Sequence, residues 1–260
     1  MMTAEDPEVL YWYRHLQGNH REWTKRILTE SVLHFAAPQT LNDPFDCRVH
    51  FRSSFSLKEL KHKYSTLANK NMPHLNREQR RAKVAADLKA VDPQGLLSFM
   101  TSQLQAKVNT TGVLCLSATD SNILLWSHYA AGHKGLCLKF AATRYTPFFG
   151  LAQRVKYSQD YPQPDLLGAS PEEQVDAFLL TKATDWMYEE EWRIIDHDKG
   201  PGGQVFPKEM LLGVIFGALM KEEDKEAVNT WLQERKHPVP LYQASVASDS
   251  FSLRIDPYKP

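Results

Sequence analysis

The sequence predicts an α+β fold built on a mixed, largely antiparallel β-sheet with a helical insertion. Of its 260 residues, 42% are hydrophobic and 24% are charged, the usual composition of a globular protein that buries a core. Strand-like and helix-like hydrophobic patterns follow one another without a strict βαβ alternation, which favours α+β over a parallel α/β arrangement. We expect a single domain over residues 1–260, with the helical insertion over residues 55–107.

The first 46 residues predict a compact β-α-β start. Residues 9–14 (VLYWYR) are short, aromatic and bounded by proline and glycine, as expected of a strand. A helix over residues 22–30 and a second short strand over residues 32–35 follow. Residues 38–46 hold two prolines and three Asx residues, which predicts a structured turn.

The insertion is predicted to contain three helices because capping residues mark three helix starts. These are Ser56 with Glu59, Asn76 with Gln79, and Asp92 followed by Pro93. Within residues 57–91, nine lysines and arginines outnumber three aspartates and glutamates, whereas the whole chain carries 31 of each sign. The insertion is therefore basic and the remainder of the chain is acidic.

The second half of the chain mixes short strands with helices. A capping box of Ser170 and Glu173 marks the start of one of these helices. Strands are predicted at residues 112–117, 135–140, 153–157, 189–195, 212–216, 241–246 and 251–255, and helices at residues 123–131, 170–184 and 222–234.

Composition and charge exclude several classes of protein. The formal net charge is zero, so binding to nucleic acid or a membrane would need a local patch. Apolar runs fall short of the roughly 20 residues of a membrane-spanning helix, and the N-terminus lacks a secretory pattern, which predicts no membrane contact and a cytoplasmic location. Cys47, Cys115 and Cys137 have no C-x-x-C spacing, so we expect reduced thiols and no metal site.

Two polar clusters near the N-terminus are candidate binding sites. The first strand carries Tyr11 and Tyr13 and ends with Arg14, and an arginine there can hold a phosphate or carboxylate through two parallel hydrogen bonds. The alternative is a surface arginine beside core aromatic side chains. Asn42, Asp43 and Asp46 lie in the predicted turn, where they either contact a substrate or bond their own backbone. Their spacing lacks the ligand count of a calcium loop.

A third cluster combines Ser117, at the end of a strand, with Trp126, His128 and Tyr129 on the following helix. Trp126 and Tyr129 are three residues apart and share a helix face, so they form either an aromatic wall for a flat ligand or part of the core. His128 points away from the helix face that Trp126 and Tyr129 share. Ser117 does not lie in a G-x-S-x-G elbow, which argues against a serine hydrolase.

The fourth cluster, in the segment WMYEEEWR, places Glu189, Glu191 and Arg193 on one face of a predicted strand. Two acids and one arginine on a shared surface form either an exposed, ion-paired face on an edge strand or the acidic centre of a cleft. In a cleft, a fixed carboxylate stabilises an oxocarbenium-like transition state at a sugar carbon, as in glycosidases.

Five separated motifs occur along the chain: YWYR, FAAPQTLNDPFDC, VLCLS followed by LLWSHYAAGHKGLCLKF, VKY, and WMYEEEWRI. In this order they resemble the bacterial family catalogued as domain of unknown function 2971. The resemblance covers nearly the whole chain, apart from the insertion and the residues after about 220. It implies a family but no activity.

The chain also resembles the ADP-ribosyltransferase superfamily in the order of its elements. A strand that ends with an arginine comes first, a strand with a serine and an aromatic helix follow, and a Glu-x-Glu strand comes last. This resemblance implies a split β-sheet core and NAD as co-substrate, although the middle motif has Leu116-Ser117-Ala118 in place of Ser-Thr-Ser. It implies that Arg14 holds the ribose or phosphates of NAD, Ser117 lies on the central strand, Tyr129 stacks on nicotinamide, Glu191 is catalytic and Glu189 orients the acceptor. Further residues of the NAD and substrate sites would be Tyr13, Trp126, His128 and Arg193, and Asn42, Asp43 and Asp46.

The function implied is an NAD-dependent ADP-ribosyltransferase or NAD glycohydrolase, of the kind found among bacterial toxins and phage-defence effectors, with an antitoxin or inhibitor as a partner. The insertion would present a nucleic-acid or protein acceptor, or is simply a solvated helical face. Its basic residues are Lys58, Lys61, Lys63, Arg77, Arg80, Arg81 and Lys83. Two alternatives stay open. The first is a nucleic-acid-binding or nucleic-acid-processing defence protein that holds a metal through Asp43, Asp46, Glu189 and Glu191. The second is a non-enzymatic interaction module.

Overall fold

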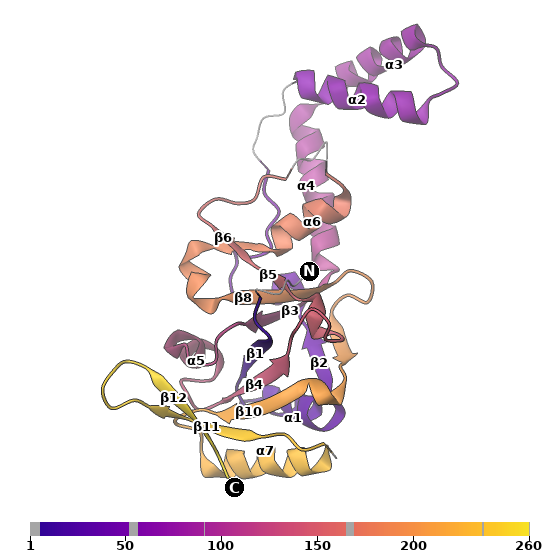
Figure 1. Cartoon of the computed structure of the whole chain (residues 1–260). Coiled ribbons are helices and arrows are strands. Elements are labelled where there is room, and N and C mark those ends of the chain that lie inside the picture. The colour runs from indigo at the N-terminus through magenta and orange to yellow at the C-terminus, as the bar shows by residue number, and fades with distance from the viewer. Residues whose placement is uncertain (1–5, 52–56, 91, 165–168, 236, 260) are drawn as a thin grey trace.

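The computed structural model describes residues 6–51, 57–90, 92–164, 169–235 and 237–259. Its centre is an open eight-stranded sheet in the order β12-β11-β10-β4-β1-β3-β8-β5 (Figure 1). Neighbouring strands of this sheet are antiparallel except β10 and β11, which are parallel. The strands are β1 (Val9–Arg14), β3 (Gly112–Ser117), β4 (Leu136–Ala141), β5 (Gln153–Arg154), β8 (Glu191–Asp196), β10 (Leu211–Phe216), β11 (Leu241–Val246) and β12 (Leu253–Pro257).

Two small sheets and seven helices complete the described part of the chain. One small sheet pairs β2 (Val32–Phe35) with β9 (Gly202–Val205), and the other pairs β6 (Lys156–Ser158) with β7 (Thr181–Ala183). The helices are α1 (His20–Glu30), α2 (Leu57–Asn71), α3 (Arg77–Ala90), α4 (Pro93–Asn109), α5 (Ile123–Tyr129), α6 (Pro171–Leu179) and α7 (Glu222–Glu234), with the 3-10 turns η1 (Pro38–Thr40), η2 (Phe149–Leu151), η3 (Thr184–Glu189) and η4 (Lys208–Met210). The prediction of an α+β fold with a mostly antiparallel sheet is confirmed.

The large sheet buries a different apolar cluster on each face. On one face, Leu28 of α1 and Val228 of α7 pack against Leu10 and Leu138 of the central strands. On the other face, Trp126 and its neighbours on α5 pack against residues that include Tyr13, Cys137 and Ile215. Alternate residues of β1 therefore point to different sites: Tyr11 and Tyr13 face α5, whereas Trp12 packs on the α1 side.

The helical arm, defined as α2 and α3, lies beyond the far end of α4 and away from the large sheet (Figure 1). Ala68 and Val84 are its buried apolar residues among those described. Asn76 and Gln79 cap each other's backbone at the start of α3, and Asp92 accepts the N–H groups of Gln94 and Gly95 at the start of α4. These two predicted helix starts are confirmed, whereas the predicted Ser56 cap lies outside the described residues.

Several predicted boundaries are wrong. The helix expected over residues 170–184 ends at Leu179, because β7 and η3 follow immediately. The strand expected over residues 153–157 is divided between β5 and β6, which pair with β8 and β7 in different sheets. Strand β9 was not predicted, since its sequence GGQV has no apolar alternation. The strand expected from residue 189 begins at Glu191, so Glu189 lies in the turn before the strand.

Candidate functional site

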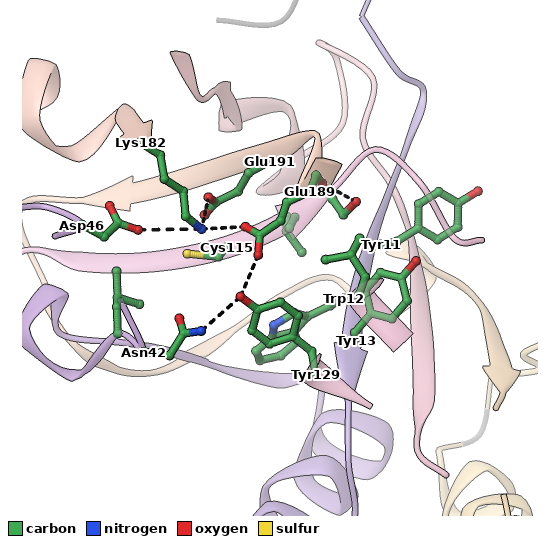
Figure 2. Close-up of a pocket in the computed structure, with 14 residues that line it drawn as sticks. Tyr11, Trp12, Tyr13, Asn42, Asp46, Cys115, Tyr129, Lys182, Glu189 and Glu191 are labelled. Atoms are coloured by element: carbon green, nitrogen blue, oxygen red, sulfur yellow. Dashed lines mark hydrogen bonds and ion pairs between the residues drawn. The ribbon is translucent and has the colours of Figure 1, made fainter. Parts of the chain in front are cut away.

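A pocket of about 140 Å³ opens at the ends of β1, β3 and β8, next to α5 (Figure 2). The register of the sheet brings its walls together, because Ser117 of β3 pairs with Tyr11 of β1 on one side and with Glu191 of β8 on the other. The lining residues are Tyr11, Trp12, Tyr13, Leu41, Asn42, Asp46, Cys115, Leu116, Ser117, Leu125, Tyr129, Lys182, Glu189 and Glu191.

The carboxylate of Glu189 reaches this pocket because the chain turns sharply before β8. Glu189 is the last residue of η3, and Glu190 adopts a left-handed conformation with φ 45° and ψ 49°. The Ser117 hydroxyl donates to the Glu189 carbonyl at 2.7 Å, which fixes the backbone of this turn. Glu189 is therefore not a strand residue, and the prediction that it extends the strand face of Glu191 and Arg193 is wrong.

Two partners hold the Glu189 side chain. Tyr129 donates its hydroxyl hydrogen to Oε1 at 2.7 Å, and Lys182 Nζ lies 2.6 Å from Oε2. Asn42 donates in turn to the Tyr129 hydroxyl at 3.2 Å, as Figure 2 shows. A carboxylate in this arrangement has a fixed position on the pocket wall.

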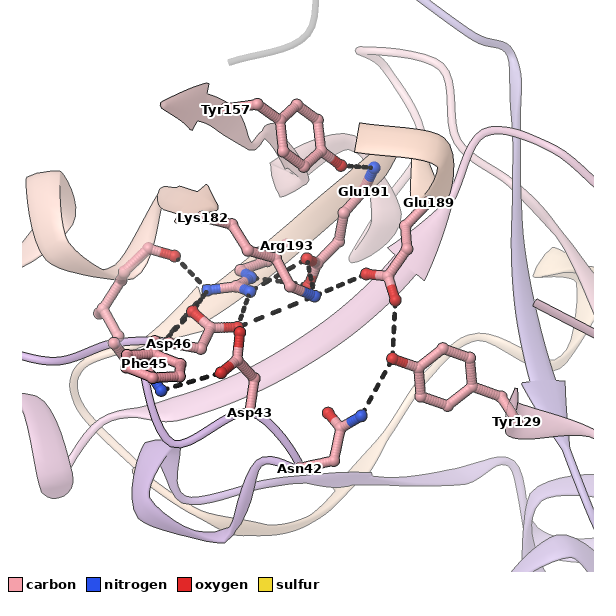
Figure 3. A network of polar contacts seen from close by, with 12 residues as sticks. Asn42, Asp43, Phe45, Asp46, Tyr129, Tyr157, Lys182, Glu189, Glu191 and Arg193 are labelled. Carbon is pink, nitrogen blue, oxygen red and sulfur yellow. Dashed lines mark hydrogen bonds and ion pairs between the residues drawn. The ribbon is translucent and has the colours of Figure 1, made fainter. Parts of the chain in front are cut away.

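One wall of the pocket is formed by a buried charge network of three carboxylates and two cations, namely Asp46, Glu189, Glu191, Lys182 and Arg193 (Figure 3). Of these five residues, Arg193 does not line the pocket itself. Arg193 is fully buried and bonds Glu191 through Nε at 2.7 Å and Asp46 through Nη1 at 2.9 Å. Lys182 Nζ lies 3.0 Å from Glu191 Oε2 as well. The network leaves a surplus of one formal negative charge.

The two glutamates of the network differ in their protonation chemistry. Burial alone would raise the pKa of Glu191, but the charges of Arg193 and Lys182 outweigh it and lower that pKa to about 2. Burial raises the pKa of Glu189 above its ordinary value; Lys182 opposes this rise and Glu191 adds to it. Glu191 is therefore firmly ionised, whereas Glu189 accepts a proton more readily.

Eight of the residues predicted from sequence line this pocket: Tyr11, Tyr13, Asn42, Asp46, Ser117, Tyr129, Glu189 and Glu191. Two others lie behind it. Arg193 is covered by the carboxylates that it bonds, and the buried Asp43 accepts the backbone N–H of Phe45 at 2.9 Å. Asp43 therefore stabilises the turn by bonding its backbone, which was the stated alternative to contact with a substrate.

Arg14 does not reach the pocket. It follows Tyr13 on β1, so its side chain lies on the α1 side of the sheet, where Nη2 contacts His20 Nδ1 at 3.2 Å and the guanidinium lies over the Trp12 ring. The expectation that Arg14 joins Tyr129 and Glu191 in one NAD site is therefore wrong in this structure, because strand alternation separates neighbouring side chains.

Trp126 and His128 also lie outside the pocket lining. Trp126 is fully buried, donates its ring N–H to the Asp120 carbonyl at 2.7 Å and meets Tyr13 edge to face, so it is a core residue. His128 is exposed beside the rings of Trp186 and Tyr188. Helix α5 thus contributes Tyr129, with Leu125, to the pocket.

Sequence reasoning missed the central cation, Lys182. Its side chain is 5% exposed and it links three carboxylates, yet it occurs in an ordinary stretch, TKA, that carries no motif. Its burial is the signal that identifies it, since lysine is almost never fully buried unless paired. Cys115 also lines the pocket and was not among the predicted site residues.

Within the described part of the chain, no three His, Cys, Asp or Glu side chains are arranged to hold a metal ion. The ammonium of Lys182 lies between the carboxylates that the nucleic-acid-processing alternative assigned to a metal. None of the described helices has the length and apolarity needed to cross a lipid bilayer.

Comparison with known proteins identifies no relative. No protein-family model matches the chain, and no curated protein or solved structure is significantly similar to it. The resemblances to the domain of unknown function 2971 family and to the ADP-ribosyltransferases therefore stay predictions.

Proposed function

We propose that the chain is an enzyme that cleaves the bond between nicotinamide and ribose in NAD and transfers ADP-ribose to an acceptor or to water. The observation that carries this proposal is the Glu189 carboxylate, which Tyr129 and Lys182 hold on the wall of a pocket that also contains Tyr11 and Tyr13. We assign the catalytic role to Glu189 in place of Glu191, because Glu191 is bound tightly by Arg193 and Lys182.

The charge and shape of the pocket suit the nicotinamide end of NAD. The nicotinamide ring is a flat cation, and the pocket offers it the rings of Tyr11, Tyr13 and Tyr129 together with a surplus negative charge. Among the residues lining the pocket, the one cationic side chain, Lys182, is already paired with carboxylates. The phosphates of NAD would therefore extend towards solvent.

Cleavage would place positive charge on the ribose. The bond between C1′ and the ring nitrogen breaks with both electrons on nicotinamide, which leaves as a neutral molecule. The Glu189 carboxylate would stabilise the oxocarbenium-like ribose, as fixed carboxylates do in glycosidases. Water or an acceptor hydroxyl then forms the new C1′–O bond, and its proton passes to Glu189, whose raised pKa favours this transfer.

The test is nicotinamide release from NAD by the wild type, Glu189→Gln and Glu190→Gln. Glu190 is the matched control, because it is the exposed neighbouring acid and does not line the pocket. We expect Glu189→Gln to slow release by about 100-fold or more, the usual cost of losing one group that stabilises transition-state charge, and Glu190→Gln to behave as wild type.

Two results would contradict the proposal. One is a wild type that releases no nicotinamide, either alone or with nucleic acid or protein acceptors present. The other is a Glu189→Gln variant that melts as the wild type does and retains its activity. The first result would favour the non-enzymatic interaction module, and the second would remove Glu189 from the catalytic mechanism.

A second candidate function, contact with nucleic acid, is favoured by the exposed basic side chains of the helical arm. Lys58, Lys61, Arg77, Arg81 and Lys83 are all exposed, and residues 57–91 carry a surplus of six positive charges. Such a surface binds phosphates without reading base sequence. This function is compatible with the first, since a nucleic acid held by the arm would be an acceptor for ADP-ribose.

A further inference from the structure

Among the described residues, the guanidinium of Arg14 has no counter-ion. No carboxylate among the described residues pairs with it, and its buried Nε has no hydrogen-bond partner. Burial lowers the pKa of Arg14 to about 10, with no acidic neighbour to restore it. A buried cation with no paired anion lowers the free energy of unfolding, and a bound anion would offset that loss.

Two histidines beside Arg14 present further hydrogen-bond donors. His20 Nδ1 lies 3.2 Å from Arg14 Nη2, and because arginine only donates, Nδ1 is the acceptor and Nε2 carries the ring hydrogen. His15 Nδ1 likewise accepts the backbone N–H of Gln17 at 3.3 Å, which leaves its hydrogen on Nε2. The two rings lie with centroids 4.0 Å apart, so both N–H groups belong to one cluster.

The histidines are neutral, so the cluster carries the single charge of Arg14. Burial, with the charge of Arg14, lowers the pKa values of His15, His20 and His34, that of His20 to about 4. His34 stacks on Trp23, which in turn contacts His20. A guanidinium and two imidazole N–H donors in a neutral surrounding are a suitable set for a tetrahedral oxyanion.

We propose that Arg14, His15 and His20 form a binding site for a phosphate group, either inorganic phosphate or the end of a phosphomonoester. The site would hold the phosphate by charge-assisted hydrogen bonds from Arg14 and by the Nε2–H groups of the histidines. It does not depend on the NAD-cleaving activity, because Arg14 and the Glu189 pocket lie on opposite sides of β1.

The first test is a thermal-shift titration with sodium phosphate and with glycerol phosphate, each compared with sodium chloride at equal ionic strength. Phosphate that binds the folded state alone raises Tm, and we expect a rise of about 2–4 °C for the wild type at saturating concentration. Arg14→Gln should lose this rise. Arg26→Gln is the matched control, since Arg26 lies on exposed α1 surface and pairs with Glu30.

The outcomes are distinct from those of the NAD experiment. Glu189→Gln should keep the phosphate response in full, so failure of the proposed enzyme leaves this site testable. A response to glycerol phosphate equal to that of inorganic phosphate indicates a phosphomonoester ligand, and a response to inorganic phosphate alone indicates the free ion. An equal response in Arg14→Gln, or none beyond that of chloride, would overturn the proposal.

A second measurement needs no variant and so does not depend on the folding of Arg14→Gln. The imidazole nitrogens of the wild type are followed by NMR against pH, with and without phosphate. A bound dianion would favour the charged imidazole, so the pKa of His20 should rise from about 4 towards its ordinary value. Unchanged titration of His15 and His20 at saturating phosphate would exclude the site.

Discussion

Glu189 and Glu191 are separated by one residue, yet their partners give them different roles. Glu191 is bound by both buried cations, whereas Glu189 shares Lys182 with it and turns its other oxygen to Tyr129. Pairs of carboxyl groups whose environments push their pKa values apart often divide acid-base work between them. Here the division makes Glu191 an anchor for Arg193 and Lys182, and it supports Glu189 as the reactive group of the proposed enzyme.

The anchoring role of Glu191 predicts a pH-dependent contribution to stability. Its pKa in the folded chain is about 2, below the ordinary value, so its ionised form stabilises the fold above about pH 4.5. This contribution is lost as the pH falls from about 4.5 towards 2. The free energy of unfolding of the wild type should therefore exceed that of Glu191→Gln by a few kcal/mol at pH 6, and the difference should shrink towards pH 3.

Urea unfolding of both proteins across this range measures that difference. Glu172→Gln, on an exposed acid at the start of α6, is a suitable control and should show no comparable change. A difference between wild type and Glu191→Gln that stays constant with pH would mean that the buried carboxylate is not held by Arg193 and Lys182.

Among the secondary-structure elements, the turn between η3 and β8 decides where the Glu189 carboxylate lies. A continuous strand would have placed Glu189 and Glu191 side by side on one face. The left-handed residue Glu190 instead ends η3 and starts β8 in a new direction, and its carbonyl accepts the N–H of Ala118 at 3.0 Å. The turn therefore joins β3, β8 and the Glu189 carboxylate at one edge of the pocket.

Glycine at position 190 should stabilise the fold. A left-handed conformation costs a non-glycine residue about 1 kcal/mol, and the Glu190 side chain is exposed. We expect Glu190→Gly to unfold at higher urea than Glu190→Ala, with a difference in free energy of about 1 kcal/mol. If the alanine variant proves as stable as the glycine variant, the backbone there is not left-handed.

Considered as a whole, the molecule separates its charges between two parts. Residues 57–91 carry a surplus of six positive charges although the chain is neutral, so the remaining residues carry a matching negative surplus. The arm that holds this positive charge lies away from the sheet and from the Glu189 pocket (Figure 1). A polyanion would therefore approach the arm and be repelled by the rest of the chain.

This separation predicts salt-dependent binding of nucleic acid by the arm. The double variant Arg77→Gln/Arg81→Gln, on exposed residues one helical turn apart, should weaken binding of an oligonucleotide and reduce the slope of log K against log salt by about 1 per lost phosphate contact. Fluorescence anisotropy at several salt concentrations measures both. The double variant Lys208→Gln/Lys221→Gln, on exposed residues outside the arm, should bind as the wild type does. Equal slopes for the two double variants would exclude the arm as the nucleic-acid surface.

The sequence by itself determined the class of fold and much of the composition of the site. Hydrophobic periodicity located β1, β3 and β10, and capping residues located the starts of α3, α4 and α6, because these signals depend on neighbouring residues alone. Polar clusters in the turn after β2 and around the start of β8 supplied Asn42, Asp46, Glu189 and Glu191 to the pocket.

Only the tertiary structure decided how these residues face one another. Lys182 carries no local motif, and its role comes from three carboxylates contributed by η3, β8 and the turn that contains Asp46. Arg14 and Tyr13 are adjacent in sequence but face opposite sides of the sheet, so one joins the histidines and the other joins the pocket. Local sequence specifies the path of the backbone over a few residues, whereas the partner of a buried charge is set by packing between distant segments.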